Sequence, residues 1–328
     1  MNSPLLSICI ATYNQPQEMT SLLSSLEKQV TPEVEVVVRD DSPNEETRKI
    51  VEHYQNSFPI RYIKGEKIGL DRVVIDITKK ATGKYVWWFG DDELVDGAVE
   101  YILEILKKNP ETIFIWVNSS SIDDGTLSLE LGGDRFLLDH NEAIERIGDL
   151  LGYISATIFQ RDRMLAGILY SERYIGTAFV NLFLVLYVIC QPGRLYYVQT
   201  PLIHSQSKVP EKPLWYDPFQ VFAVNLYHIV NDETIRKKFK RKSIRRMLAS
   251  NFGGVWRTIL VHRAKGVATG MGASSPKLLT LFRLYWSFHE FWIALPFLAS
   301  PNYVVRAAYR TYKLIFRKTR LRFRKQSN

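Results

Sequence analysis

The sequence predicts an α/β protein in which a mostly parallel sheet is flanked by helices and followed by a helical C-terminal region. Two observations lead to this fold class. Strand-like and helix-like segments alternate through residues 4–120, which implies parallel strands joined by right-handed crossovers. From residue 214 onward the apolar spacing is mainly that of helices, rich in Trp, Tyr and Arg.

Six short segments are predicted to be strands because they are apolar or β-branched and lie between turn-forming residues. They are Leu5–Ala11, Val34–Val38, Ile60–Ile63, Tyr85–Phe89, Ile113–Val117 and Ser155–Phe159. The first of them is almost wholly apolar, as expected of a strand that is covered on both faces. We therefore expect helices on both sides of the sheet.

The segments between these strands are predicted to be amphipathic helices, since apolar residues recur every three or four positions. Ser42–Glu45 has the sequence of a capping box with proline at the first helical position. Gly83 stands where a helix over residues 71–82 should end. The longest apolar run, Ala178–Cys190, is shorter than the ~20 residues that span a bilayer and predicts a buried helix.

The chain has 328 residues, enough for one large domain or for one domain with an appendage. A boundary is expected in the proline-punctuated stretch Val209–Pro213, which separates residues 1–210 from residues 211–328. Cys9 and Cys190 are predicted to be free thiols of a reducing compartment, because they lie far apart in apolar runs. The N-terminus runs straight into a strand pattern and lacks the basic segment of a secretory signal.

Three polar clusters follow predicted strands: Thr12-Tyr13-Asn14, Asp40-Asp41 and Asp91-Asp92-Glu93. In open α/β sheets, ligands bind outside the carboxyl ends of the strands. Carboxylates gathered there repel one another and need a cation, for which Mg²⁺ or Mn²⁺ is the natural choice; phosphates and water usually complete the shell of such an ion. The alternative is that each acidic pair merely begins a helix, where its charge suits the helix dipole. Three clusters at equivalent strand ends favour a metal-bridged nucleotide diphosphate.

These motifs also carry a resemblance. The order SICIATYNQ, VEVVVRDDS, GKYVWWFGDDE resembles glycosyltransferase family 2 over residues 4–120. The resemblance implies a GT-A-type fold with a Rossmann-like nucleotide-binding half and a nucleotide-sugar donor. It divides residues 1–210 into a nucleotide-sugar-binding part, 1–120, and an acceptor side, 121–210. The GLDR…YVWWFGDDE variant is similar to the abequosyltransferase-like subgroup of O-antigen and capsule enzymes, which implies a deoxy- or dideoxyhexose donor.

The resemblance assigns roles residue by residue. Asp41 takes the position that hydrogen-bonds the nucleobase, and Asp71-Arg72 matches a segment near the ribose and diphosphate. Asp91, Asp92 and Glu93 match the metal-binding motif, with Asp92 as the principal ligand to Mn²⁺ or Mg²⁺ and Asp91 also beside the nucleotide. The residues that line the nucleotide pocket are Thr12, Tyr13 and Asn14. His204 matches the late histidine that some GT-A enzymes place on the metal, although a structural role is the alternative.

The chain departs from the family pattern in two places. The metal motif usually ends in Asp, whereas Glu93 stands third here. The usual Glu-Asp pair, which supplies the catalytic base, is replaced by Ile175–Ala178. Since an inverting transfer needs a carboxylate to take the proton of the acceptor hydroxyl, the nearest acid, Glu172, is the candidate base. The identity of the base and the stereochemical outcome stay open at this point.

Charge is divided unevenly along the chain. Residues 1–233 contain 21 Lys and Arg against 33 Asp and Glu, whereas residues 234–328 contain 22 against one. Six cations form one helical stripe: Arg306, Arg310, Lys313, Arg317, Arg320 and Arg324. Beside it runs an apolar stripe that starts at Val305, so this helix is expected to lie on an anionic membrane surface. A solvated helix packed on the protein is the alternative, and nucleic acid is disfavoured because no motif for it accompanies the charge.

The expected function is transfer of a sugar to a glycan or polyprenyl-diphosphate-linked acceptor at the cytoplasmic face of the plasma membrane. One rival is a nucleotidyltransferase, which commonly needs a Gly-rich, basic loop after the first strand; Ala11–Gln15 has neither Gly nor Lys. The other rival is a catalytically degenerate domain that serves as a binding or assembly module. The missing Glu-Asp pair supports it, and the intact acidic cluster argues against it.

Overall fold

The computed structural model describes residues 3–90, 92–205, 217–266 and 275–311. The chain divides into two compact units. The first comprises residues 1–215 and 229–244, and the second comprises residues 216–228 and 245–328. The predicted boundary at residue 211 falls outside the described residues.

The first unit is built on a nine-stranded sheet with the order β3-β2-β1-β4-β8-β6-β9-β5, and β7 pairs with β9. Neighbours β3, β2, β1 and β4 are mutually parallel, as are β6 and β9, whereas β5, β7 and β8 run antiparallel to their neighbours. The strands are β1 Leu6–Thr12, β2 Val34–Asp40, β3 Ile60–Lys64, β4 Tyr85–Phe89, β5 Glu93–Leu94, β6 Thr112–Ser121, β7 Arg135–Leu137, β8 Thr157–Gln160 and β9 Arg194–Ser205. The predicted α/β class with a mostly parallel sheet is confirmed.

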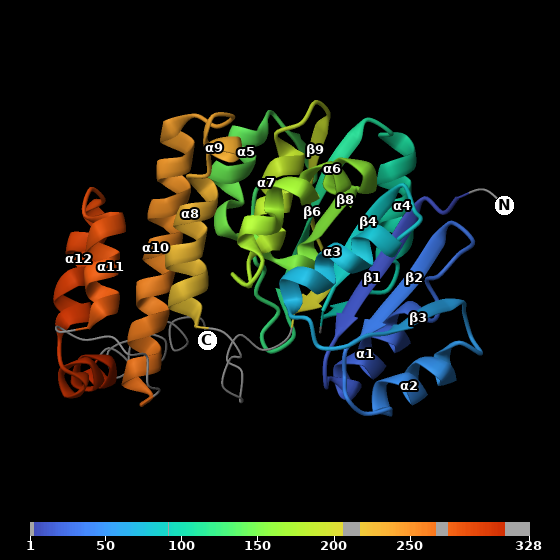
Figure 1. Cartoon of the computed structure of the whole chain (residues 1–328), viewed down its shortest axis with the longest axis horizontal. Coiled ribbons are helices and arrows are strands. Elements are labelled where there is room, and N and C mark those ends of the chain that lie inside the picture. Colours follow the sequence, from blue (N-terminus) through green and yellow to red (C-terminus); the bar gives the residue numbers. More distant parts are fainter. Residues whose placement is uncertain (1–2, 91, 206–216, 267–274, 312–328) are drawn as a thin grey trace, which may run out of the picture. The chain divides into compact units, whose positions relative to one another are not determined.

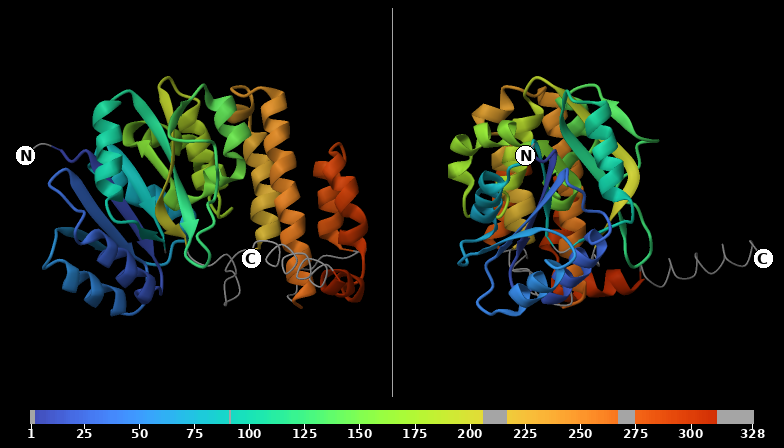
Figure 2. Two further views of the ribbon diagram at one scale, coloured as in Figure 1. Left: turned by 180° about the vertical axis from the view of Figure 1, so that it is seen from behind. Right: turned by 90° about the vertical axis from the view of Figure 1, so that its right-hand side faces the viewer.

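Helices cover both faces of this sheet (Figure 1). Figure 1 places α3, α6 and α7 in front of the sheet, and the view from behind in Figure 2 places α4 on the other face. The helices of this unit are α1 Pro16–Leu26, α2 Glu46–Tyr54, α3 Leu70–Lys80, α4 Ala98–Lys108, α5 His140–Arg146, α6 Arg161–Ser171, α7 Val180–Ile189 and α9 Glu233–Arg236. Shorter helical turns are η1 Gly148–Gly152, η2 Ile154–Ala156 and η3 Glu172–Tyr174.

Alternation along each strand produces two apolar layers. Ile8, Val36 and Trp87 belong to the layer that packs against α1, α2 and α4. Their neighbours in sequence point to the opposite face, where the Trp88 indole donates a hydrogen bond to Thr78 of α3 and its ring meets Phe159. Because both faces are covered, the central strands are apolar throughout, as predicted.

Two local predictions are wrong, and one strand was not predicted. The capping box does not form: α2 starts at Glu46 without a side-chain cap, and the Asn44 side chain instead accepts from the Glu46 N–H. Gly83 does not end α3 as a left-handed cap; a Cβ there would lie 2.6 Å from Ser7 Oγ, so this glycine permits close approach to β1. The strand β9 was not predicted, because Pro201 and a register shift against β6 interrupt its pattern.

The second unit is helical in the described residues. It contains η4 Phe219–Asn225, the start of α8 Leu226–Val230, most of α10 Arg241–Ala264, α11 Pro276–Tyr285, α12 His289–Ala299 and helical residues 302–311. Its core is aromatic: Phe252 contacts Tyr285 and Phe291, and the Tyr285 hydroxyl donates to the Ala223 carbonyl. A helical C-terminal region is therefore confirmed. Among the described helices, none has both the length and the apolar content needed to cross a bilayer.

Candidate functional site

The carboxyl ends of β1, β2 and β4 lie side by side, because these strands are parallel neighbours. Thr12 pairs with Asp40 across β1 and β2, and the Asp41 N–H donates to the Thr12 carbonyl at 3.1 Å. Phe89 is the last β4 residue in register with β1, so the acidic segment leaves the sheet beside Thr12. The Thr12 hydroxyl oxygen is buried and has no hydrogen-bond partner in the described part of the chain. The structure thus brings the three predicted clusters to one edge.

The turn after β1 has a left-handed residue at Asn14, whose φ is +54°. Asparagine tolerates this conformation better than most residues do, because its short polar side chain hydrogen-bonds locally. The Asn14 N–H donates to Ser42 Oγ at 2.8 Å, which joins this turn to the one after β2. Tyr13 is 38 % exposed, and Lys67 Nζ lies 4.3 Å from the centre of its ring. A partly exposed aromatic ring, with a cation over one face, therefore lies beside the strand ends.

The two aspartates after β2 differ in their partners. Asp40 is fully buried and accepts from the Ser42 N–H at 2.8 Å and from the Tyr62 hydroxyl at 2.7 Å. Burial and the Asp40 carboxylate raise the pKa of Tyr62, so this phenol stays a hydrogen-bond donor. Asp41 forms an ion pair with Arg39 Nε at 2.9 Å, and its other oxygen is 3.5 Å from the Ile68 N–H. Asp40 also lies 3.5 Å from Lys64 Nζ, so it has three partners and a structural role, whereas Asp41 is oriented by two contacts.

Arg39 and Gly65 complete this corner, and sequence reasoning missed both. Arg39 forms ion pairs with Asp41 and Asp76. Although burial acts to raise it, the hydrogen bond from Lys80 and the charge of Arg39 hold the pKa of Asp76 below its usual value. A Cβ at Gly65 would lie 2.3 Å from Asp41 Oδ1, so only glycine allows this packing. The glycine pair in the sequence GEKIG was the available signal.

The acidic segment after β4 is described only in part, because Asp91 lies outside the described residues. Asp92 is 5 % exposed, and Glu93 begins β5, where it pairs with His204 of β9. Residues directly opposite in an antiparallel pair point to the same face. His204 Nδ1 also lies 3.3 Å from Ser120 Oγ. Within the described ranges, no three His, Cys, Asp or Glu side chains are grouped as metal ligands.

Asp71 forms a clamp between α3 and the segment before α7. Its carboxylate accepts from the N–H groups of Gly176 at 2.8 Å, Ala178 at 2.8 Å and Val180 at 3.0 Å. Ala178 has φ +57°, a left-handed conformation that costs an alanine roughly 1–2 kcal/mol. The three hydrogen bonds hold this strained turn in place. The neighbouring Arg72 is exposed.

The candidate base Glu172 lies in η3 and is exposed. The two residues that follow it are anchored, since Arg173 and Tyr174 both bind Asp232. A further carboxyl, Asp149 of η1, was missed by sequence reasoning. Burial raises its pKa, and η1 packs on the start of α7, where Asn181 Nδ2 donates to the Gly152 carbonyl at 2.7 Å.

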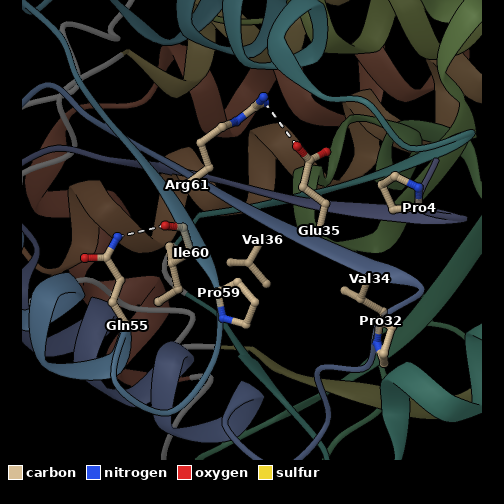
Figure 3. A pocket seen from close by; sticks show the side chains of 9 residues that line it. All are labelled: Pro4, Pro32, Val34, Glu35, Val36, Gln55, Pro59, Ile60 and Arg61. Atoms are coloured by element: carbon tan, nitrogen blue, oxygen red, sulfur yellow. Dashed lines mark hydrogen bonds and ion pairs between the residues drawn. The ribbon is translucent and has the colours of Figure 1, made fainter. Parts of the chain in front are cut away.

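A separate hollow of about 580 Å³ lies at the other end of the strands (Figure 3). Its lining is Pro4, Pro32, Val34, Glu35, Val36, Gln55, Pro59, Ile60 and Arg61. Glu35 pairs there with Arg61 at 3.2 Å and also accepts from Ser7 and from the Thr82 N–H. This hollow lies apart from the polar edge at the carboxyl ends. Its charged groups already bind one another and the backbone, so they are less available to a ligand.

Residues 7–151 match the family model described as glycosyl transferase family 2. Over these residues the chain is similar to a family 2 glycosyltransferase domain. The match spans the three polar clusters and ends in η1. The resemblance predicted from the strand-end motifs is therefore confirmed.

One of the curated relatives agrees with the predicted subgroup. Abequosyltransferase RfbV of Salmonella typhimurium is 26% identical over 219 residues, which are 61% of this chain and 66% of that protein. The GalNAc(5)-diNAcBac-PP-undecaprenol beta-1,3-glucosyltransferase of Campylobacter jejuni is 25% identical over 189 residues, 55% of this chain and 60% of that protein. The chain thus matches less than two thirds of the length of either relative.

Solved structures agree on the fold. TarS 1–349 of S. aureus superposes with a TM-score of 0.58 at 16% identity, covering 93% of this chain and 91% of that chain. The mannosyltransferase PcManGT of Pyrobaculum calidifontis, in complex with GDP-Man and Mn²⁺, superposes with a TM-score of 0.53 at 14% identity, covering 95% and 88%. The fold is accordingly of the GT-A type.

Proposed function

We propose that the protein transfers a sugar from a nucleotide-diphosphate donor to a glycan or lipid-linked glycan in bacterial surface polysaccharide synthesis. The observation that carries the proposal is the convergence of Thr12, Asp41 and the acidic segment at adjacent carboxyl ends of parallel strands within the region that is similar to family 2. The names of the relatives favour surface polysaccharides, and the likeness to an abequosyltransferase favours a deoxyhexose or dideoxyhexose donor.

The nucleobase is assigned to the corner formed by Tyr13, Asp41 and Ile68. Tyr13 offers a partly exposed ring for stacking, and Ile68, 39 % exposed, offers an apolar edge. Asp41 is an acceptor for base N–H groups, and its ion pair with Arg39 fixes the direction in which its oxygens point. This corner therefore binds and orients the donor without taking part in bond making.

The diphosphate is assigned to the edge beyond β4, with Arg72 as an exposed cation on α3. Asp92 and Glu93 supply carboxylate oxygens, and Asp91 adds a third acid in the sequence. One or two carboxylates with phosphates and water fit the coordination habits of Mg²⁺ and Mn²⁺. The ion, when bound, neutralises charge that develops on the departing diphosphate. The Thr12 hydroxyl, which has no hydrogen-bond partner among the described residues, supports a polar ligand at this edge.

The acceptor hydroxyl must lose a proton as it attacks the anomeric carbon, and a carboxylate has to receive that proton. Glu172 remains the proposed base, because it is an exposed acid four residues before the Asp71 clamp begins. Asp71 itself is poorly suited, since three backbone N–H groups already occupy its oxygens. Its contribution is to position the segment before α7.

The test is thermal unfolding with UDP, GDP, CDP and dTDP, each with and without Mn²⁺. One nucleotide should stabilise the protein, and only when the metal is present. At ~100 times its dissociation constant it adds about 2.7 kcal/mol to the free energy of unfolding. The assignment of a nucleotide-sugar donor would be wrong if no nucleotide stabilised the parent protein, even in the presence of acceptor membranes. That result would favour a degenerate binding module.

Attachment to the cytoplasmic face of the membrane is also proposed for the basic C-terminal stripe. Arg306 and Arg310 are exposed in helical residues 302–311, whereas Lys313, Arg317, Arg320 and Arg324 lie outside the described residues. Deletion of residues 301–328 should release the protein from anionic vesicles in a sedimentation assay. Unchanged sedimentation would rule out the stripe as the attachment element.

A further inference from the structure

The second unit exposes a concentrated set of apolar side chains on α11 and α12. We call it the aromatic face, and it consists of Leu279, Phe282, Trp286, Trp292, Ile293 and Phe297. Each of these side chains is between 45 % and 58 % exposed. The exposed large apolar residues of the first unit are spread more thinly along its described length, for example Leu138 and Leu169. Contiguous exposed apolar surface of this kind marks an interaction site.

The face is continuous across the two helices, which lie side by side (Figure 1). The Phe282 ring lies 6.2 Å from the Trp292 ring, edge to face. Trp292 Nε1 also donates to the Trp286 carbonyl at 2.8 Å. Farther along α12, Phe297 stacks on Trp256 of α10 at 5.9 Å. The exposed side chains of both helices therefore belong to one surface.

α12 is apolar on two opposite sides. Phe291, Ala294 and Leu298 recur at intervals of three and four and are buried in the core. Trp292, Ile293 and Phe297 occupy the other side and are exposed. A helix that is apolar all round is normally buried in a protein core or in a membrane. Among the described residues, only one side of α12 is covered, and its other side is an exposed apolar surface.

A buried arginine holds this helix rigidly. Arg263 of α10 is 2 % exposed and donates to the carbonyls of Phe297 at 3.2 Å, Leu298 at 3.0 Å and Ser300, and to Asn302 Oδ1 at 2.8 Å. These are carbonyls at the C-terminus of α12, which lack partners within a helix. The positive charge also suits the negative end of the helix dipole. The aromatic face is thus presented on a fixed scaffold.

Charge identifies the partner. The second unit contains sixteen Lys and Arg against two acids, Asp217 and Glu290. Asp217 is already paired with Lys277 at 2.6 Å. Arg283 is exposed on α11, and Arg257 lies over the ring of Trp256 beside Phe297. Tryptophan and phenylalanine among basic residues suit the boundary between lipid headgroups and acyl chains.

We propose that the aromatic face inserts into the interface of an anionic lipid bilayer, with the surrounding arginines on the headgroups. This extends the proposed function, because it gives the enzyme access to acceptors embedded in the membrane. It also assigns insertion to α11 and α12, in addition to the attachment proposed for the basic stripe after residue 301. Neither helix has to cross the bilayer for this mode of binding.

The experiment measures binding of the full chain to vesicles of phosphatidylcholine, with and without phosphatidylglycerol. The parent protein should bind only the anionic vesicles, and acyl-chain-brominated lipid should quench its fluorescence. Trp286→Ser with Trp292→Ser should lower partitioning by about tenfold or more, since each tryptophan offers a large apolar area. Arg283→Gln should lower it by about fivefold. Quenching should fall in the tryptophan variant because Trp87, Trp88 and Trp116 are buried in the first unit.

A matched control replaces Leu138 and Leu169, exposed apolar residues of the first unit, with Ser; vesicle binding should not change. Equal binding by the tryptophan variant and its parent would overturn the proposal, as would equal binding to neutral vesicles. So would a lipid-free dimer that this variant converts to a monomer, because the face would then belong to a second copy. Nucleotide-induced stabilisation of the same variant, which should match the parent, separates failure of this inference from failure of the proposed function.

Discussion

The two units of the chain break the ordinary rule of burial in opposite directions. In the first unit, acidic side chains are buried: Asp41, Asp71 and Asp92 are 6 %, 4 % and 5 % exposed. In the second unit, large apolar side chains such as Trp286 and Trp292 are exposed, while the charged Arg263 is buried. Burying a charge and exposing apolar surface both cost free energy, so each needs a compensating interaction. Where the chain itself supplies the compensating contacts, we interpret the residue as structural. Where it does not, we interpret the residue as part of a binding site.

This criterion separates the buried charges that have partners from the groups that lack them. Asp40, Asp71 and Arg263 each have several partners within their own unit, and their roles are structural. Thr12 has a buried hydroxyl without a partner among the described residues, and the aromatic face of α11 and α12 lacks a cover there. We propose that an external ligand supplies the missing contact in each of these two places: a nucleotide in the first unit and a lipid surface in the second.

The largest effect is expected from Asp92→Asn. Asp92 is the proposed principal ligand of Mg²⁺ or Mn²⁺, so the variant should hold the ion less tightly. Sugar transfer should then fall by about 100-fold or more, because the ion no longer stabilises the charge on the departing diphosphate. Binding to anionic vesicles should stay at the parent level, since the aromatic face belongs to the other unit. Transfer is measured with membranes as the acceptor source, and vesicle binding by sedimentation.

The matched control is Asp96→Asn, an exposed acid four residues farther along the chain. It should leave transfer unchanged. Comparable losses in both variants would mean that net acidity, rather than the position of Asp92, governs the reaction.

The second largest effect is expected on stability, from Asp71→Ala. Three backbone N–H groups lose their acceptor, which should lower the free energy of unfolding by about 2–4 kcal/mol. Chemical denaturation of the full chain measures this loss. Asp162→Ala is the comparison, because Asp162 is 89 % exposed and pairs only with the adjacent Arg161 in α6.

Ala178→Gly probes the same clamp from its other side. Glycine adopts φ +57° without steric cost, so the variant should be more stable than the parent by up to about 1 kcal/mol. Combined with Asp71→Ala, it should recover part of the lost stability, because the strained turn then needs less support. A destabilised Ala178→Gly protein would show that the turn is not strained.

The clamp also shows where sequence reasoning reached its limit. Strands β1 to β4, β6 and the edge with Thr12 and Asp41 were predictable, because each depends on a local run of apolar residues or on the polar residues that follow one. Asp71 was predicted to approach the ribose and diphosphate. Its observed partners lie 105 to 109 residues later in the chain, and no local pattern encodes such a contact.

Arg263 gives the same lesson in the second unit. Within the sequence it is one cation among many, yet it is buried because carbonyls 34 to 37 residues away converge on it. The strand β9 was missed for a related reason: its register against β6 shifts between Val198 and Ile203, around Pro201, so its halves are joined by pairing with β6 and not by one continuous sequence pattern. His204 was picked from the sequence, but its alignment with Glu93 depends on that pairing.

A smaller effect is expected from Asp41→Asn. The amide keeps one acceptor oxygen but loses the charge that pairs with Arg39, so nucleotide affinity should fall by about tenfold. Calorimetric titration with the nucleotide chosen by the thermal screen measures it. Asp76→Asn, which removes the other partner of Arg39, should lower affinity less, because Asp76 only orients the arginine. The reverse order would move the nucleobase contact from Asp41 to Arg39.

The smallest effect concerns Asp149, a partly buried carboxyl of η1 whose pKa is raised by burial. Since the folded state holds this proton more tightly than the unfolded state, stability should fall as pH rises from the unfolded pKa of ~4 to the folded pKa, and the loss should persist above it. Asp149→Asn removes the ionisation, so the variant should be more stable than the parent at neutral pH and should match it in acid. Denaturation from about pH 3 to about pH 8 follows this difference. A constant offset across that range would mean that Asp149 does not titrate differently on folding. A gain in stability together with a loss of transfer would instead make Asp149 a second candidate for the base, besides Glu172. Buried acids at active sites commonly lower the stability of the folded protein, and Asp149 would then be one of them.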